Sequence, residues 1–214
     1  MRHLERLPEP DILIDKKELW KNNLIKSGKK RPDSNKYGHK SIRLQLNSMS
    51  HQKCFYCESK LKELPKEVDH HIEVSFDKKL SYEWTNLYLS CQNCNKKIPH
   101  SAIPVHDVLD PCEDTEEKIR NHLTFHDEII QPNNNSELGL NTIKKFRLDT
   151  ELLENLRLKK LKDFYKVILE IRKNQNLENR QKLNLDEYNL LVSFTRIDSS
   201  YSRMFEVILR QYVK

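Results

Sequence analysis

Cys54-Phe-Tyr-Cys57 and Cys91-Gln-Asn-Cys94 are the two stretches that decide how the centre of this chain folds. Each is a Cys-x-x-Cys knuckle, and residues 58–90 lie between them. Such a knuckle offers two thiolates at the spacing that tetrahedral zinc prefers, and a site of four cysteines leaves no open position for chemistry. The two knuckles therefore predict one structural Zn²⁺ held by Cys54, Cys57, Cys91 and Cys94. Four ordinary buried cysteines are the less favoured alternative.

An Asp-His pair lies between the knuckles, in the stretch Val68-Asp69-His70-His71-Ile72. A structural zinc domain has no need of such a pair. The Asp69 carboxylate is a suitable oxygen ligand for a hard divalent cation, and His70 can accept a proton from water near neutral pH. A two-residue motif is weak by itself, so its weight depends on the residues around it.

The surrounding motifs come in a characteristic order. After the Asp-His pair follow Trp84-Thr85-Asn86-Leu87 and then Ser90-Cys91-Gln92-Asn93-Cys94-Asn95. This order of knuckle, Asp-His, Asn-Leu, knuckle and Asn resembles the HNH endonuclease family. With Tyr56-Cys57-Glu58 and the segment Val108–Asp114, it most resembles the HNH nucleases of Septu and retron-associated antiphage systems. The resemblance covers about residues 45–150.

The resemblance implies a role for each matching residue. Asp69 and Asn95 would hold a catalytic Mg²⁺ or Mn²⁺, His70 would be the general base, and Asn86 would brace the loop that orients it. One strand would end at Asp69-His70, a second would cover residues 88–90, and a short helix would start near Gln92. Many family members follow the histidine with two aliphatic residues and a proline. This chain has His71 there, which strand alternation should turn away from His70.

The expected fold class is therefore α+β: a zinc-stapled ββα-metal (HNH) domain with surrounding and C-terminal α-helices. We expect a basic, mostly irregular lead-in over residues 1–44, the nuclease domain over 45–130, and a helical region over 140–214. We expect a helix over about residues 41–49, shortly before Cys54. Residues 131–139 are rich in turn formers and are expected to be a linker. Beyond it, apolar periodicity predicts a small bundle of helices near 150–171, 185–194 and 199–212.

The charge pattern points to a polyanionic partner. Residues 21–60 hold ten Lys and Arg against two acids, and residues 101–140 hold two against nine. A basic segment directly before the cysteine module suits nucleic acid, DNA or RNA, although a solvated basic face explains the charge equally well. Lys96 and Lys97 are further candidates for phosphate contact, or simply exposed lysines.

The expected function is hydrolysis of nucleic-acid phosphodiester bonds by the nuclease effector of an antiphage system. The alternative is a zinc-ribbon binding subunit without catalysis, which leaves Asp69, His70, Asn86 and Asn95 unexplained. The resemblance also implies partners: an ABC-like ATPase and, in some systems, a retron reverse transcriptase with its RNA-DNA. With no long apolar run or signal-like start, and with cysteines spaced for metal rather than disulfides, we expect a cytoplasmic protein without a membrane role.

Overall fold

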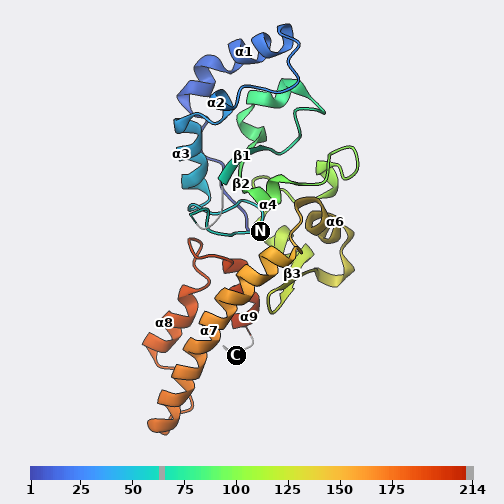
Figure 1. Cartoon of the computed structure of the whole chain (residues 1–214). Helices are drawn as coiled ribbons and strands as arrows, with labels where there is room; N and C mark the ends of the chain where they lie inside the picture. The colour runs from blue at the N-terminus through green and yellow to red at the C-terminus, as the bar shows by residue number, and fades with distance from the viewer. Residues whose placement is uncertain (63–65, 211–214) are drawn as a thin grey trace.

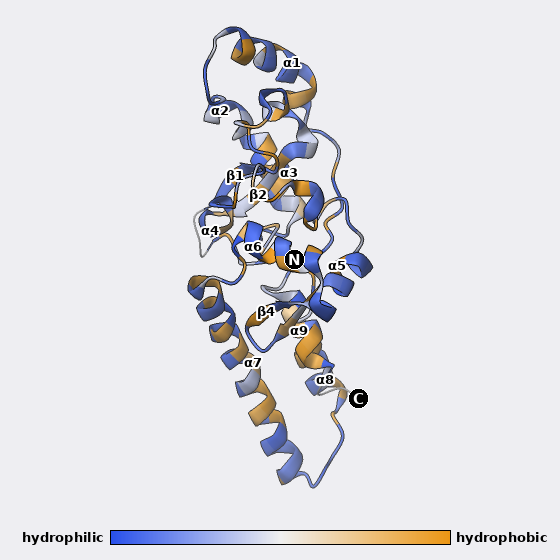
Figure 2. Ribbon diagram, turned by 90° about the vertical axis from the view of Figure 1, so that its right-hand side faces the viewer, coloured by the Kyte–Doolittle hydropathy of each residue, from blue (hydrophilic) through white to orange (hydrophobic). Residues whose placement is uncertain are grey.

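The computed structural model describes residues 1–62 and 66–210. The molecule is elongated, with α1 at one end, a two-stranded sheet near the middle and the long helix α7 running to the other end (Figures 1 and 2). The four strands in this described part of the chain form two separate antiparallel pairs, β1 with β2 and β3 with β4. Among the described residues, no helix is both long and apolar enough to cross a membrane.

The elements have the following bounds. The helices are α1 (Asp11–Lys26), α2 (Ser34–Tyr37), α3 (Lys40–Met49), α4 (Gln92–Asn95), α5 (Glu116–His122), α6 (Glu137–Phe146), α7 (Glu151–Leu177), α8 (Leu185–Ser193) and α9 (Ser202–Leu209). The strands are β1 (Lys66–His70), β2 (Leu87–Cys91), β3 (Leu123–His126) and β4 (Ile129–Pro132). Short 3-10 turns are η1 (Lys78–Tyr82), η2 (Trp84–Asn86), η3 (Val105–Asp107) and η4 (Asn133–Asn135).

The centre of the fold is β1, β2 and α4. β1 and β2 are antiparallel, so that Asp69 is opposite Tyr88 and His70 is opposite Leu87. α4 starts directly after β2 and packs against both strands. The expected strand ending at His70, the second strand and the helix from Gln92 are all confirmed. The start of α4 lies beside the start of β1, because Cys91, the residue before α4, is opposite Lys66.

The N-terminal region is more helical than the mostly irregular lead-in that the sequence predicts. Residues 11–26 form α1, a helix of 16 residues, and α3 supplies the expected helix before Cys54. α1 buries only Leu13 and Leu24, which is too little apolar surface to show as periodicity in the sequence. Its position is fixed instead by contacts with η1 and by Lys21, whose Nζ lies 3.1 Å from Glu83 Oε1.

The prediction of a linker over residues 131–139 is also wrong. These residues complete β4, turn through η4 and begin α6. The asparagines serve the turn, because Asn134 and Asn135 have positive φ. Gly139 is required by packing: a Cβ on it would lie 2.1 Å from the carbonyl oxygen of His122. Turn-forming residues here mark a tight, well-packed corner instead of a break between domains.

The predicted C-terminal helices are present as α7, α8 and α9, although residues 211–212 of the last one lie outside the described residues. They do not form a separate small bundle. α8 packs on α7, whereas α9 packs on β3. The rings of Phe164, Phe194 and Phe205 lie 5.0–5.3 Å apart and join the three segments. The apolar stripe of α7 therefore faces the rest of the protein.

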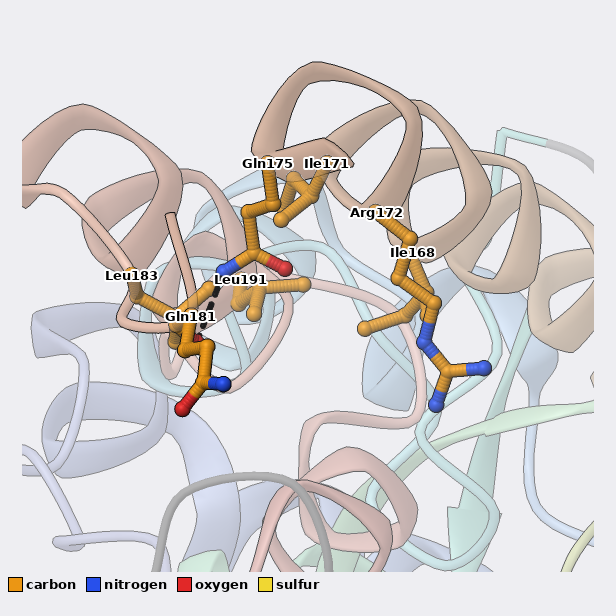
Figure 3. Close-up of a pocket in the computed structure, with 7 residues that line it drawn as sticks. All are labelled: Ile168, Ile171, Arg172, Gln175, Gln181, Leu183 and Leu191. Carbon is orange, nitrogen blue, oxygen red and sulfur yellow. Dashed lines mark hydrogen bonds between the residues drawn. The ribbon is translucent and has the colours of Figure 1, made fainter. Parts of the chain in front are cut away.

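Between α7 and the segment leading into α8 lies a groove of about 160 Å³ (Figure 3). Ile168 and Ile171 of α7 and Leu191 of α8 form its apolar part. Gln175 Nε2 donates to the carbonyl oxygen of Gln181 at 3.4 Å across one edge. The groove marks where the two helices diverge, and it is remote in sequence from the Asp-His pair.

Glu58, directly after the first knuckle, links the metal-binding centre to α9. Its carboxylate accepts hydrogen bonds from Lys53 Nζ at 3.2 Å and Ser202 Oγ at 2.7 Å, and all three residues are buried. Burial favours the protonated form, but the surrounding cations, namely the N-terminal amino group, Lys53 and Arg2, outweigh it and lower the pKa of Glu58 to about 2. Glu58 is therefore a buried anion that holds the segment around Lys53 and the start of α9 together.

Replacing Glu58 with alanine should destabilise the protein by about 3–5 kcal/mol, because it leaves the Lys53 ammonium buried without its partner. Urea denaturation measures the loss. Glu170→Ala on the exposed side of α7 is the control and should change the free energy of unfolding by less than about 0.5 kcal/mol. Equal stability of the two variants would show that the buried ion pair contributes nothing.

Candidate active site and metal site

The four predicted zinc ligands converge in the structure. All four cysteines are buried, and their Sγ atoms lie within 4.8 Å of one another. The Sγ atoms of Cys57 and Cys91 are 3.7 Å apart. Tetrahedral Zn²⁺ with bonds of about 2.3 Å places its sulfurs about 3.8 Å apart. The cluster therefore fits a structural zinc site, and it joins a turn before β1 to the end of β2 and to α4.

The four buried thiols also need a cation if they are to ionise together. Burial raises the pKa of Cys54 and of Cys94 well above the ordinary value for a thiol, whereas at Cys57 hydrogen bonds from the neighbouring thiols outweigh burial and lower the pKa. Four buried thiols therefore become thiolates together only when a metal ion compensates their charge. The first knuckle is held in place by its backbone, since the Phe55 amide donates to the Leu89 carbonyl of β2 at 2.9 Å.

Arg157 of α7 adds a buried cation beside the thiols, which sequence reasoning missed. Its guanidinium donates to the Leu148 carbonyl at 2.8 Å. Burial lowers its pKa, while the charges of Cys57 and Cys94 act in the opposite direction. A signal was available in the sequence, because Arg157 falls on the apolar stripe of α7, four residues from Leu153 and from Leu161. A charged residue in such a place points to a buried anion.

A hydrogen bond to a backbone carbonyl fixes the tautomer of neutral His70. Its Nε2 lies 2.9 Å from the carbonyl oxygen of Ser81, which can only accept, so Nε2 carries the hydrogen and neutral His70 has its lone pair on Nδ1. The ring of Tyr37 packs edge-on at 4.6 Å. Burial lowers the pKa of His70 below its ordinary value. The imidazole is thus neutral near pH 7, oriented, and able to accept a proton at Nδ1.

Asn86 holds the loop around His70. Its side-chain Oδ1 accepts from the amide of Ile72 at 2.7 Å, and its Nδ2 donates to the carbonyls of Ile72 and Leu80 at 3.0 and 3.1 Å. The carbonyl of Ser81, which bonds His70, is next in the chain to Leu80. The buried amide of Asn86 therefore fixes both sides of this loop, in keeping with the bracing role expected for it.

Asp69 is buried beside a lysine. The Nζ of Lys97 lies 2.7 Å from each carboxylate oxygen and also donates to the carbonyl of His70. Tyr56 donates its hydroxyl to Asp69 Oδ2 at 2.8 Å. Lys97 is buried with Asp69, so it is not one of the exposed lysines that the sequence allowed for. A divalent ion on Asp69 would have to displace this ammonium group from the carboxylate.

Asn95 contacts β1 at Glu67, near the start of that strand and two residues before Asp69. Its Nδ2 donates to the carboxylate of Glu67, which leaves Oδ1 available as a ligand. Asp69 and Asn95 thus lie on the two packed elements β1 and α4. One carboxylate and one amide oxygen fit a Mg²⁺ that takes its other ligands from water and phosphate. Within residues 1–62 and 66–210, the cysteines are the only cluster of three or more His, Cys, Asp or Glu suited to a metal.

His71 belongs to the core, away from His70. Its ring stacks at 4.5 Å on Tyr88, and its Nδ1 lies 3.3 Å from the hydroxyl of Tyr56. Burial lowers its pKa to about 3, so the ring stays neutral at physiological pH. Tyr56 also stacks on Phe146 of α6 at 4.0 Å. This buried aromatic stack backs the Asp-His strand, and no local sequence pattern predicts its long-range members.

Comparison with known proteins identifies the family of the segment that contains these residues. Residues 54–100 match the model of the HNH endonuclease family. This segment is an HNH domain. It contains both knuckles and all four residues of the Asp69, His70, Asn86 and Asn95 set.

The chain is also similar in sequence to Septu proteins. It is 32% identical over 117 residues to the Septu protein PtuB of Bacillus thuringiensis, covering 54% of this chain and 44% of that protein. It is 28% identical over 181 residues to a Septu protein PtuB of Bacillus mycoides (strain KBAB4), covering 70% of this chain and 59% of that protein. The chain therefore spans about half the length of the curated relatives it matches.

We expect one tightly bound Zn²⁺ per chain, needed for folding. Cys91→Ser should lose the metal and melt at a clearly lower temperature, because its thiolate is removed from a buried set of four. Elemental analysis measures the metal and thermal denaturation measures the stability. Cys112→Ser, at a buried cysteine outside the cluster, is the control and should keep the metal. Folded wild-type protein without zinc would contradict the assignment.

Proposed function

We propose that the protein is a metal-dependent HNH endonuclease that hydrolyses nucleic-acid phosphodiester bonds, as the nuclease of a bacterial antiphage system. The observation that carries this proposal is the pair at the end of β1. His70 is fixed with Nδ1 as its proton acceptor, and Asp69 next to it is a buried carboxylate. A binding module without catalysis has no need to orient a neutral, partly buried imidazole in this way.

In the proposed reaction, His70 Nδ1 takes a proton from a water molecule whose oxygen attacks the phosphorus, while the bond from phosphorus to the leaving oxygen breaks. The Ser81 carbonyl stabilises the imidazolium that forms, because Nε2 already donates to it. A divalent ion bound by Asp69 and Asn95 would supply charge stabilisation for the pentavalent phosphorus and the leaving oxygen. Asn86 keeps the loop, and with it the imidazole, in position.

Lys97 has a part in this proposal as the group that neutralises Asp69 before substrate binds. Its Nζ has the reach to contact a phosphate oxygen once it leaves the carboxylate, because a lysine ammonium is a point charge on a flexible stem. Lys96, in contrast, is exposed and stays a candidate for a simple backbone phosphate contact.

The assignment of the rest of the chain is also a proposal. We infer that residues 45–130 act as the nuclease domain, that residues 1–44 contribute to substrate binding, and that residues 140–214 contact partners. The similarity to Septu proteins supports a multi-protein system. An ABC-like ATPase is the expected partner, and a retron reverse transcriptase with its RNA-DNA is a further one.

His70→Ala should abolish cleavage while leaving the fold, the zinc and nucleic-acid binding intact, because it removes the proton acceptor. Asp69→Ala and Asn95→Ala should also be inactive, but should partly recover at high Mg²⁺ or Mn²⁺, since each weakens a metal site. Cleavage of labelled DNA and RNA, with any physiological partner present, measures the effect.

The control is His71→Phe, which keeps the ring stacked on Tyr88 and should retain most of the activity. Undiminished cleavage by His70→Ala would favour a binding subunit whose preparation carries a contaminating nuclease. An inactive His71→Phe beside an active His70→Ala would move the base by one residue and with it the strand register.

Neutralising Lys26, Lys29, Lys30 and Arg31 together should weaken nucleic-acid binding without changing sequence preference. All four are exposed, around the end of α1, so their charges act through phosphates and counterion release. The slope of log affinity against log salt should become shallower by roughly 0.7–0.9 for each phosphate that the variant no longer neutralises. An unchanged slope would assign this segment to a protein partner.

A further inference from the structure

A pocket of about 180 Å³ lies between α1, the loop after it and η1, outside the HNH residues described above. Its apolar lining includes Trp20 of α1 and Tyr82 of η1, whose ring centroids are 5.6 Å apart. Tyr82 is buried, whereas Trp20 is only partly covered. Part of the Trp20 indole therefore remains accessible at the pocket, and the buried Tyr82 packs against it.

The polar lining combines cations with hydrogen-bonding groups. Lys29, Arg31 and Lys36 are among the lining residues, and the Lys36 ammonium lies 5.8 Å from the centre of the Trp20 ring. Asn23 and Asp33 also line the pocket. A site for a free anion alone would gain nothing from a carboxylate or an indole. A nucleotide uses all three kinds of group, since its base stacks and accepts or donates hydrogen bonds while its phosphate binds cations.

The pocket is next to the proposed base. Tyr82 follows Ser81, whose carbonyl bonds His70 Nε2 at 2.9 Å. Lys36 precedes Tyr37, whose ring contacts the His70 ring at 4.6 Å. Burial raises the pKa of Tyr37, and Arg31 and Asp33 are both near enough to influence it. Two separate walls of the pocket thus continue directly into residues that contact His70.

We propose that this pocket receives an unstacked base of the substrate strand, next to the phosphate that is cut, with the base against Trp20 and its backbone on Lys29, Arg31 and Lys36. The inference deepens the proposed nuclease function and rests on it for the identity of the ligand. A base in the pocket cannot remain paired in a regular duplex. The preferred substrate is therefore single-stranded, looped or locally opened nucleic acid.

The test measures binding and not cleavage, in the His70→Ala background and without added divalent ion. The probes are a short single strand of mixed sequence, as DNA and as RNA, and a strand of equal length made of abasic nucleotides. The abasic strand keeps the phosphate charges and lacks the bases. The base-bearing strands should bind about tenfold more tightly than the abasic strand, within the range that stacking of one base on an aromatic side chain gives.

Substitutions at position 20 separate stacking from general packing. Trp20→Leu keeps an apolar side chain against Tyr82 and should remove most of the preference for bases, whereas Trp20→Phe should keep most of it. Leu19→Ala, at the exposed neighbouring position, is the control and should bind like the parent protein. The base-bearing strand should also quench the fluorescence of Trp20, and this signal should vanish in Trp20→Phe although binding persists.

Equal affinity for base-bearing and abasic strands, or a preference that survives in Trp20→Leu, would overturn the pocket assignment and leave a purely electrostatic surface. A fully paired duplex binding as tightly as the single strand would overturn it as well. These outcomes are independent of the nuclease proposal, because wild-type cleavage and the His70→Ala effect are measured separately. Loss of cleavage activity alone would leave the binding preference intact.

Discussion

The convergence of four buried thiols is the constraint on which the rest of this structure depends. The thiols come from a turn before β1, from the end of β2 and from α4, so one ion bound there fixes the geometry of a very small sheet. Two strands of five residues cannot be stable alone in water. A metal ion held by the four thiols, with the buried Arg157 guanidinium near them, would supply the stability that the short sheet lacks.

Two buried carboxylates of this protein are each paired with a lysine. Asp69 is paired with Lys97, and Glu58 with Lys53, so neither carboxylate is left alone in the interior. The two pairs differ in what surrounds them. Glu58 ties together segments that must stay fixed, namely the first knuckle and α9. The Asp69 pair is made by a lysine just beyond α4, next to the oriented His70, where an incoming phosphate would compete for the ammonium.

The helices outside the HNH segment extend the site in two directions. α1, α2 and the loop between them line a basic and aromatic pocket, and Tyr37 of α2 packs against His70. α6 closes the other side through Phe146, which stacks on Tyr56, the residue that donates to Asp69. Elements far apart in sequence thus control the surroundings of two adjacent residues. A match over residues 54–100 therefore includes the Asp-His pair but not α1, α2 and α6, which surround it.

The sequence alone determined the central unit, because its signals are short-range. Cys-x-x-Cys spacing predicted the thiol cluster, the family resemblance that the Asp-His and Asn-Leu motifs support implied both strands and α4, and the apolar period predicted α7. What only the tertiary structure decided is which distant groups meet. α1 buries just two apolar residues, so no period indicated it, and the asparagine-rich corner at 133–135 was mistaken for a linker. The placement of Lys97 on Asp69 and of the Ser81 carbonyl on His70 depends on packing between separate elements, and a hydrogen bond between residues far apart leaves no spacing in the sequence to read.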